Sequence, residues 1–508
     1  MLAQCIAATP WGIDALPVRV EIDVHHGLPS TQIVGLPDAA VRESRERVRS
    51  AIRNCGFELP PRVVIINLAP ADLRKQGNHL DLAIAVAWLA ATGHLAEGRL
   101  DDRLVVGELG LDGSVRPVRG GLAVADLARR LGCREVLLPA ANAAEAAALG
   151  TVPVVGIRSL AAAVGHLAGS GPLASTTPAA DDGPPPPAAD LAEVRGQEGA
   201  KRVLEIAAAG GHNLLYVGPP GCGKTLLARR LPALLPPLTR GEAIEVTKIH
   251  SLAADRPPAG LIRRRPFRSP HPGVSTAGLV GGGVGVPRPG EASLAHCGVL
   301  FLDELPEFKR DALEALRQPL EEGRLSIVRS RAQLSFPARF ALLAAMNPCP
   351  CGHLGDERKE CRCTPTQIER YRSRLSGPLL DRIDLHFEVA AVGLAELTAA
   401  PNGEPSARVA ARVAAARQSQ ARRFGADVAM PVNASLGPAD LEVHCPLDAA
   451  AGRLLEAAFE RLALSARGLH RVLKVARTIA DLAGADSIAA AHVAEAIQYR
   501  PLASRLDV

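Results

Sequence analysis

Short apolar runs alternate with longer helical patterns over most of the chain. Residues 63–68 form a β-branched apolar run that predicts a strand, and residues 80–92 predict a buried helix. A second helix is predicted at residues 120–131. Further strands are predicted at residues 104–106, 135–138, 213–217, 299–302 and 342–345. Strands that alternate with helices in this way predict a parallel, doubly wound sheet, and therefore an α/β fold.

The pattern changes at two places. Residues 169–190 read GSGPLASTTPAADDGPPPPAAD, which lacks hydrophobic periodicity and is rich in proline, glycine and serine, so we predict a disordered linker there. From about Leu394 onward the strand signal fades, and alanine-rich helical patterns continue to the C-terminus. The 508 residues are too many for one hydrophobic core. We therefore expect a mixed α/β domain at 1–168, an α/β core at 191–393 and a separate helical lid at 394–508.

Composition narrows the class of protein. The apolar fraction of 47% and the charged fraction of 22% are ordinary for a soluble globular protein. No apolar run is long enough to span a membrane, and residues 1–11 lack the basic and apolar regions of a signal peptide, so we expect a cytoplasmic protein with no membrane partner. The formal net charge of +5 permits a nucleic-acid partner without demanding one.

A glycine-rich segment follows the strand predicted at 213–217 and fits the pattern G-x-x-x-x-G-K-[ST]. Its residues are Gly218, Pro219, Pro220, Gly221, Cys222, Gly223, Lys224 and Thr225. Glycines let backbone N–H groups turn toward phosphate oxygens, Lys224 reaches the β- and γ-phosphates of ATP, and the Thr225 hydroxyl ligates Mg²⁺. A glycine-rich turn without a ligand is the alternative. The strand before the segment and the helix predicted after it favour a P-loop, because the helix dipole then points at the anion.

Two further strand ends complete a nucleotide site. The sequence VLFLDE is an apolar strand that ends in Asp303 and Glu304. With a P-loop upstream, Asp303 is expected to hold Mg²⁺ through water, and Glu304 to polarise the attacking water. Asn347 ends the next strand and can hydrogen-bond the γ-phosphate or that water. Without the P-loop, the acidic pair would indicate an ordinary turn and Asn347 an ordinary loop residue.

The chain resembles the magnesium-chelatase-like branch of the AAA+ ATPases in three motifs, GPPGCGKT, VLFLDE and MNPCPCG. More narrowly, it resembles the YifB/ComM family. The resembling stretches include GLPDAAVRESRERVRSAI, INLAPADLRKQG, FRSPH, PLLDRIDLH and LSARGLHRVLKVARTIADL, and they cover nearly the whole chain apart from the linker. The resemblance implies a P-loop AAA+ core, at 191–393, with a helical lid of the magnesium-chelatase type.

The resemblance also implies roles that the residues alone do not show. Arg382, in LLDRID, matches the arginine finger that reaches the γ-phosphate of a neighbouring subunit, and Arg467, in LSARG, matches the sensor-2 arginine of the lid. Taken alone, either arginine would be a surface ion-pair residue. A finger that acts across an interface requires an oligomer, and the family implies a homo-hexameric ring.

The function that the resemblance implies is a DNA motor. Members named ComM are linked to natural transformation, as motors that migrate branched DNA during uptake and recombination, which implies a helicase acting on single-stranded or branched DNA. One alternative is a chelatase-type ATPase that remodels a protein partner or inserts a metal. A third reading is an ATP-dependent peptidase.

The N-terminal region resembles the Lon-protease or ribosomal-S5 type of α+β fold. The resemblance lies in residues 107–142, GELGLDGSVRPVRGGLAVADLARRLGCREVLLPAAN. The Lon pattern has a lysine after Gly-Gly-Leu, where this chain has Ala123, and its serine position falls near Asn78 and His79, where no serine stands. A Ser-Lys dyad needs both groups. We therefore expect a non-catalytic domain kept for binding or assembly, which conflicts with the peptidase alternative.

Four of the ten cysteines crowd into residues 349–363, which in a cytoplasmic chain suggests a metal cluster and not disulfides. Cys349 and Cys351 form one C-x-C pair, Cys361 and Cys363 form the other, and a polar loop separates them. Four thiolates in two close pairs can form a tetrahedral Zn²⁺ site. Such a site would be structural and would staple the loop after Asn347. Four reduced cysteines in a loop are the alternative.

Two basic segments are candidates for DNA contact. Residues 326–336 predict a hairpin with Arg329 and Arg331 near its turn, where ring translocases place a pore loop. Residues 261–285 carry Arg263, Arg264, Arg265 and Arg268, where this branch of AAA+ proteins has an insertion. Solvated loops are the alternative for both. The helix predicted at 407–424 is expected to be mainly a solvated face. It carries Arg408, Arg412, Arg417, Arg422 and Arg423.

Overall fold

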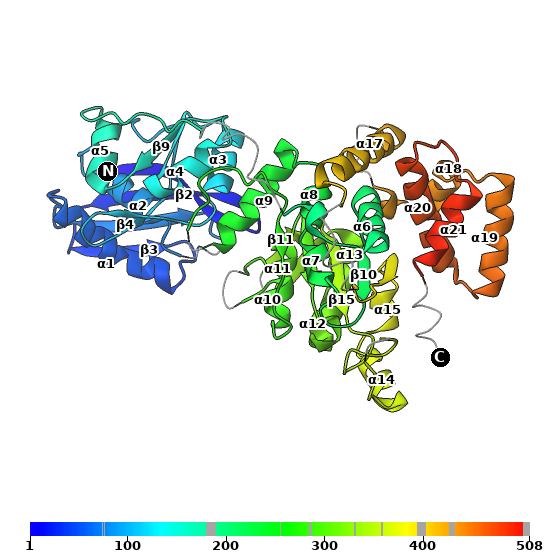
Figure 1. Cartoon of the computed structure of the whole chain (residues 1–508). Coiled ribbons are helices and arrows are strands. Elements are labelled where there is room, and N and C mark those ends of the chain that lie inside the picture. The colour runs from blue at the N-terminus through cyan, green and yellow to red at the C-terminus, as the bar shows by residue number, and fades with distance from the viewer. Residues whose placement is uncertain are drawn as a thin grey trace.

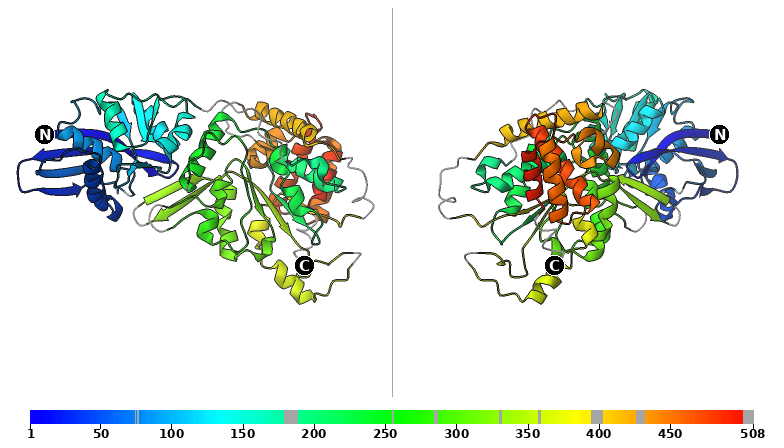
Figure 2. Two further views of the ribbon diagram at one scale, coloured as in Figure 1. Left: turned by 60° about the vertical axis from the view of Figure 1, so that its left-hand side comes forward. Right: turned by 90° about the vertical axis from the view of Figure 1, so that its right-hand side faces the viewer.

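The computed structural model describes residues 1–73, 75, 77–178, 189–254, 256–283, 287–329, 332–356, 359–393, 403–425 and 432–500. Figure 1 shows an N-terminal α/β unit, a central α/β unit and a group of C-terminal helices, in that order along the molecule. The left view of Figure 2 also shows the N-terminal unit at one end of the molecule, away from the C-terminal helices, and the right view looks onto those helices.

A mixed seven-stranded sheet of order β3-β4-β2-β1-β5-β8-β9 forms the centre of the N-terminal unit. β2 pairs antiparallel with β1 and with β4, and the other neighbours pair parallel. Leu104 and Val105, adjacent in β5, enter different hydrophobic clusters, so helices cover both faces of the sheet. Its strands are β1 (Leu2–Trp11), β2 (Asp14–His25), β3 (Ser30–Val34), β4 (Val63–Ala69), β5 (Arg103–Val105), β8 (Glu135–Pro139) and β9 (Val154–Ile157). Its helices are α1 (Ala39–Asn54), α2 (Asp81–Ala91), α3 (Gly121–Arg130), α4 (Ala140–Ala147) and α5 (Leu160–Ala168), and β6 (Glu108–Leu109) and β7 (Val115–Arg116) form a separate ribbon.

The central unit is built on a parallel five-stranded sheet of order β11-β12-β15-β10-β16. Leu214 and Tyr216 of β10 face one hydrophobic cluster, and Leu215 and Val217 face the other. Because the strands are parallel, all their carboxyl ends lie at one edge of the sheet, and loops at that edge are the usual place for a ligand. The strands are β10 (Leu214–Val217), β11 (Phe267–Arg268), β12 (Val299–Leu302), β15 (Ala341–Met346) and β16 (Leu385–Glu388), and β13 (Arg324–Arg329) and β14 (Ala332–Pro337) form a hairpin.

Helices of the central unit cover both faces of this sheet. They are α6 (Glu198–Gly210), α7 (Lys224–Ala228), α8 (Leu231–Leu234), α9 (Arg240–Ala253), α10 (Thr276–Val280), α11 (Glu291–Leu294), α12 (Arg310–Ala315), α13 (Arg317–Glu322), α14 (Pro365–Arg372) and α15 (Gly377–Leu380). Three short 3₁₀ turns lie at Leu191–Glu193, Leu305–Glu307 and Asn433–Ser435.

The C-terminal helices share one hydrophobic cluster with α6 and a face of the central sheet. They are α17 (Ser406–Phe424), α18 (Pro438–His444), α19 (Ala449–Arg461), α20 (Ala466–Leu482) and α21 (Ala490–Gln498). Val472, Val475 and Ile479 recur at helical spacing along α20 and are buried in this cluster. Among the described residues, no helix is both long enough and apolar enough to cross a membrane.

Helix α9 holds the N-terminal unit on the central unit (Figure 1). Nζ of Lys248 lies 2.9 Å from a carboxylate oxygen of Asp14 and 2.8 Å from one of Asp126. The Ser251 hydroxyl accepts a hydrogen bond of 3.0 Å from the backbone N–H of Gly120, at the start of α3. The two units therefore contact each other through the ion pairs of Lys248 and through the N-terminus of α3.

Most of the predicted elements are confirmed, although one feature of the N-terminal unit was missed. Residues 63–68 lie in β4, residues 80–92 overlap α2, and the three strands predicted between 213 and 345 are β10, β12 and β15. A parallel sheet is confirmed for the central unit only, because the long antiparallel hairpin of β1 and β2 makes the N-terminal sheet mixed. Residues 179–188 of the predicted linker lie outside the described residues. Before them, the Thr176 N–H donates to the Val154 carbonyl at 2.7 Å, so Thr176 lies beside the start of β9.

Candidate functional site

The glycine-rich segment turns at the carboxyl end of β10, as the sequence predicts. Gly223 has a φ of +95°, in the left-handed region that glycine adopts freely, and it precedes α7. A β-carbon at Gly218 would collide with the carbonyl oxygen of Val389, which follows β16. A side chain is therefore disfavoured at Gly223 by its left-handed backbone and at Gly218 by the Val389 carbonyl. The glycines at these two positions of the motif allow the P-loop turn.

Lys224 and Asn347 lie together at this edge of the sheet. Lys224 is 8% exposed and donates to the carbonyls of Gly218 and Pro219 at 2.7 and 2.8 Å. Its Nζ also donates to Oδ1 of Asn347 at 3.2 Å. The structure thus brings the predicted phosphate-binding lysine into contact with the amide predicted to act on the γ-phosphate.

Thr225 and Asp303 form the adjacent pair. The Thr225 hydroxyl donates to Oδ2 of Asp303 at 2.7 Å. A hydroxyl and a carboxylate are the hard oxygen ligands that Mg²⁺ prefers, so the pair fits the ion. The next residue, Glu304, is exposed and has a φ of +52°, which is unusual for a residue with a side chain. The P-loop, Asp303, Glu304 and Asn347 therefore lie at one edge of the sheet.

Gln197 is a residue of this edge that sequence reasoning missed. Its side-chain amide donates to the carbonyl of Cys222, within the P-loop, at 3.3 Å and to the carbonyl of Ala390 at 2.6 Å. Gln197 therefore links the P-loop to the segment that follows β16. The Gly-Gln pair at 196–197 is the only signal, since both residues have positive φ, and such a pair is common in loops.

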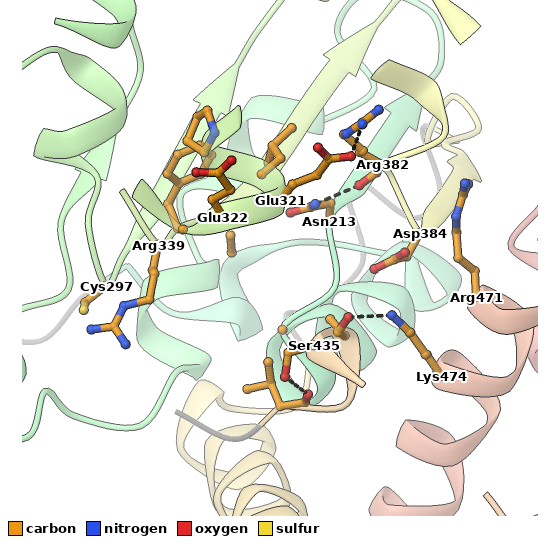
Figure 3. Close-up of a pocket in the computed structure, with 18 of the residues that line it drawn as sticks. Asn213, Cys297, Glu321, Glu322, Arg339, Arg382, Asp384, Ser435, Arg471 and Lys474 are labelled. Atoms are coloured by element: carbon orange, nitrogen blue, oxygen red, sulfur yellow. Dashed lines mark hydrogen bonds and ion pairs between the residues drawn. The ribbon is translucent and has the colours of Figure 1, made fainter. Parts of the chain in front are cut away.

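Arg382 and Arg467 lie at the opposite edge of the sheet, at the amino ends of the strands. Both line a cavity of about 880 Å³ whose wall includes Asn213, directly before β10 (Figure 3). The basic residues of this wall are Arg265, Arg339, Arg382, Arg417, Arg467, Arg471 and Lys474, and the acidic ones are Glu321, Glu322, Asp381 and Asp384. Within the subunit, Arg382 pairs with Glu321. The cavity is thus an electropositive site built from the central unit and α20.

The two edges are separated by the length of the strands. From Asn213 to Gly218, five residue steps at about 3.3 Å each give roughly 16 Å. That distance is longer than an arginine side chain, so Arg382 cannot reach phosphates held at Lys224 of the same chain, and Arg467 lines the same cavity at the far edge. Sequence reasoning named both residues, but it did not predict that they share one cavity.

Helix α20 holds the turn that carries Arg382. Nη2 of Arg471 lies 3.2 Å from Oδ1 of Asp381. On the other side of Arg382, Nδ1 of the buried His212 lies 3.0 Å from Oδ2 of Asp384, and its Nε2 lies 2.8 Å from Oγ1 of Thr478. Arg471 and Thr478 both belong to α20. The arginine turn is therefore fixed to this helix at both ends.

The four clustered cysteines lie together beside the P-loop edge. The sulfur of Cys349 lies 3.4 Å from that of Cys351 and 3.6 Å from that of Cys361, and the sulfurs of Cys351 and Cys361 are 3.7 Å apart. Cys363 accepts a hydrogen bond of 3.4 Å from the backbone N–H of Cys351. Tetrahedral zinc with Zn–S bonds of about 2.3 Å requires sulfurs about 3.8 Å apart. The thiols thus fit a zinc ion.

The basic segments are only partly available for DNA. The predicted hairpin is formed by β13 and β14, but the side chain of Arg329 and the whole of Arg331 lie outside the described residues. In the 261–285 segment, Arg265 donates to the carbonyls of Pro236 and Cys297, at 2.6 Å each, and Arg268 forms a two-pronged ion pair with Glu291 at 2.6 and 2.7 Å. These two arginines are therefore used inside the molecule.

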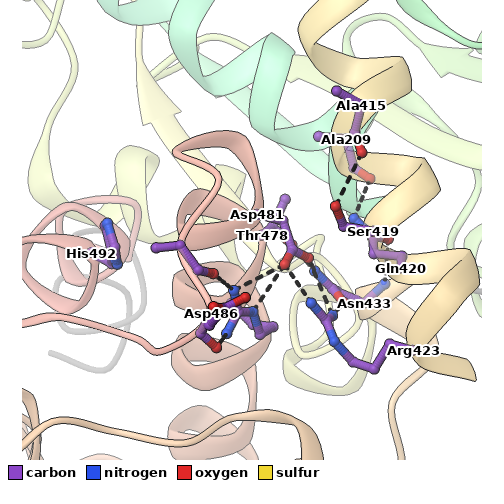
Figure 4. A network of polar contacts seen from close by, with 12 residues as sticks. Ala209, Ala415, Ser419, Gln420, Arg423, Asn433, Thr478, Asp481, Asp486 and His492 are labelled. Atoms are coloured by element: carbon purple, nitrogen blue, oxygen red, sulfur yellow. Dashed lines mark hydrogen bonds and ion pairs between the residues drawn. The ribbon is translucent and has the colours of Figure 1, made fainter.

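The prediction that α17 is mainly a solvated face is wrong for Arg417 and Arg423, whereas Arg408, Arg412 and Arg422 are exposed. Arg417 donates to the carbonyl of Ala208 at 2.7 Å, and burial lowers its pKa to about 10. Arg412 pairs with Glu205 at 2.6 Å, and Arg423 pairs with Asp481 of α20 (Figure 4). Helix α17 is therefore a structural brace between α6 and α20. The helical period of the sequence showed which arginines share a face of α17, but it did not show which groups of α6 and α20 they would bind.

The N-terminal unit has no dyad at the expected positions. Ala123 lies in the first turn of α3 and is 1% exposed. Oδ1 of Asn78 accepts a hydrogen bond from Arg47 at 3.0 Å. Burial lowers the pKa of His79 to about 4, which keeps this ring neutral. None of these three residues is a nucleophile with a base beside it.

Comparison with known proteins shows the family to which the chain belongs. The family model described as "Magnesium chelatase, subunit ChlI" matches residues 190–397, "Subunit ChlI of Mg-chelatase" matches 20–142, and "Magnesium chelatase, subunit ChlI C-terminal" matches 403–500. The fold and site define a magnesium-chelatase-like ATPase of the AAA+ class, with a P-loop at the edge of a parallel sheet.

Full-length relatives narrow the family. The YifB protein of Salmonella typhimurium is 46% identical over 97% of this chain and 95% of its own. The protein Rv2897c of Mycobacterium tuberculosis is 44% identical over 99% of both chains. The competence protein ComM of Haemophilus influenzae is 43% identical over 100% of this chain and 99% of its own. The chain belongs to the YifB/ComM family.

Proposed function

We propose that the protein is a cytoplasmic ATP-hydrolysing motor that works on DNA as a hexameric ring. The observation that carries the proposal is the placement of the P-loop and of Arg382 with Arg467 at opposite edges of one sheet. A subunit built in this way cannot complete its own site. When subunits stack head to tail, the arginine edge of one meets the P-loop edge of the next, and a closed ring results if the rotation closes.

We assign the roles at the P-loop edge as follows. The backbone of Gly218–Thr225 and Lys224 hold the phosphates, and Thr225 with Asp303 holds Mg²⁺, the ion that neutralises phosphate charge when bound. Glu304 polarises the attacking water, and Asn347 orients that water or the γ-phosphate. Arg382 and Arg467 of the neighbouring subunit supply positive charge for the transition state.

The assignment of DNA rests on the family. One full-length relative carries the name competence protein, and the sequence resemblance is to motors that migrate branched DNA. The formal net charge of +5 and the β13–β14 hairpin agree with such a partner. We assign the N-terminal unit as a non-catalytic domain of the Lon/S5 type and the C-terminal helices as the lid. We also propose that the four-cysteine loop binds Zn²⁺.

A chelatase-type ATPase that remodels a protein partner is the second candidate, because the matching family models are those of a chelatase subunit. ATPase rates measured with no DNA and with single-stranded, duplex and four-way-junction DNA separate the two. We expect stimulation by single-stranded or branched DNA. No response to any DNA, together with stimulation by a protein partner, would reject the DNA motor in favour of the second candidate.

A further inference from the structure

The four-cysteine loop begins and ends at the ATP site. Its first cysteine, Cys349, follows Asn347 by two residues, and Cys349 is buried. A β-carbon on Gly352 would approach Cδ of Pro220 to 2.7 Å, so the loop packs directly on the P-loop. The short chain connection to Asn347 and the packing of Gly352 on Pro220 therefore place the loop against groups that touch or surround the phosphates in the proposed function.

The far side of the loop returns to the same place through α14. Thr364, directly after Cys363, caps this helix. At its end, the backbone N–H of Asn347 donates to the oxygen of Tyr371, and Nη2 of Arg372 donates to the carbonyl of Pro348 at 3.5 Å. Asn347 therefore lies between strand β15 and helix α14. The chain that connects Asn347 to α14 carries the four cysteines, and their sulfurs bring its two ends together.

A zinc ion at these sulfurs would join the two ends of the segment. Without a metal, the loop must be closed by packing alone, and loop closure carries an entropic cost. With the metal, Cys349 is tied to Cys361 across 12 residues, and the start of α14 is fixed relative to β15. The residue whose position depends most directly on this tie is Asn347, because it is two residues from a sulfur ligand and contacts Lys224.

We infer that zinc in the four-cysteine loop positions Asn347 for hydrolysis, so that turnover of ATP depends on the metal while binding of ATP largely does not. The inference rests on the ATPase part of the proposed function and is independent of DNA. Binding depends on the P-loop backbone and Lys224, whereas the hydrolytic step needs the amide of Asn347 in place. A displacement of about 1 Å in a group that acts on the reacting atoms can cost about 100-fold in rate.

The experiment compares zinc-loaded and zinc-stripped full-length protein, prepared with a zinc-selective chelator in excess Mg²⁺. We expect about one zinc per chain as purified. Stripping should lower kcat by about 10- to 100-fold, with the dissociation constant of a non-hydrolysable ATP analogue changed by less than about threefold. Zinc added back should restore kcat. Purified protein without zinc, or equal kcat in both forms, would overturn the inference.

Two variants separate positioning from general stability. Cys361→Ser removes a ligand far from Asn347 along the chain, and Cys133→Ser, in the N-terminal unit, is its matched control with unchanged zinc and kcat. In an Asn347→Ala background, stripping zinc should cost no further rate, since the two changes act through one group. A full additional loss in that background, or loss of analogue binding in parallel with unfolding, would show a merely structural metal. Absence of ATPase in zinc-loaded protein would instead reject the proposed function.

Discussion

Replacement of Arg382 by alanine should abolish ATP hydrolysis while leaving ATP binding close to that of the parent protein. Arg382 lies before β16 at the amino edge of the central sheet, roughly 16 Å along the strands from the P-loop at about 3.3 Å per residue. Among the described residues of its own subunit, the Arg382 guanidinium bonds only to Glu321 and the carbonyl of Pro378. An arginine finger contributes about 10³- to 10⁵-fold to kcat, so we expect a loss of at least about 1,000-fold.

Mixing two inactive variants gives a quantitative version of this test. Glu304→Gln subunits keep a normal Arg382 but cannot polarise water, whereas Arg382→Ala subunits keep a normal Glu304. In an equal random mixture, a site has an intact Glu304 from one subunit and an intact Arg382 from the next with a probability of one half times one half. The mixture should therefore reach about a quarter of the parent rate, although each variant alone is nearly inactive.

The assay is steady-state ATPase of the two variants alone and mixed, with analogue binding and sedimentation measured on the same samples. Glu322→Gln is the matched control, because Glu322 lines the same cavity and pairs with Arg324 at 3.6 Å. It should keep the parent rate. Full hydrolysis by Arg382→Ala, hydrolysis by a monomer, or no recovery in a mixture that assembles would refute a site shared between subunits.

Two other predictions concern the nucleotide and DNA. Lys224→Ala should greatly weaken both ATP binding and turnover, because the buried ammonium group is lost from the P-loop, while Glu304→Gln should bind ATP and hydrolyse it very slowly. Filter binding and ATPase rates check both variants. Normal hydrolysis by Glu304→Gln would remove Glu304 from its role. Replacing Arg329 and Arg331 together by alanine should weaken binding to all DNA sequences alike and reduce the salt slope by at most about two units. Basal ATPase should survive and DNA stimulation should disappear; unchanged affinity in a salt titration would assign the hairpin a structural role.

The P-loop edge could be predicted because its chemistry is encoded locally. Gly218, Gly223 and Lys224 follow one strand, and Asp303 and Asn347 each end a further strand. Parallel strands bring their carboxyl ends to a common edge, so three separate sequence signals necessarily converge. The contacts of Lys224 with Asn347 and of Thr225 with Asp303 follow from that rule without knowledge of any side-chain packing.

The remaining contacts depend on tertiary partners that no local pattern contains. The helical period of α17 is the same whether Arg417 faces water or the carbonyl of Ala208, which comes from α6 some 209 residues away. The β1–β2 hairpin was missed because Leu2–Trp11 contains alanine and threonine in place of a continuous branched apolar run. For Lys248, a charge in a helix indicates a solvated face by default, but its carboxylate partners come from the N-terminal unit.

In the proposed ring, the placement of α20 would let one subunit serve two nucleotide sites. Arg467 lies in this helix, and the turn that carries Arg382 is tied to the same helix through Arg471 and Thr478, so the two arginines keep a fixed separation. The turn also continues directly into β16, which pairs along β10 and so ends beside the P-loop. A close-packed sheet transmits displacement with little compliance. A change in the position of the P-loop on hydrolysis would therefore move the arginine edge as one body, which is how an event in one site would reach the arginines serving the next.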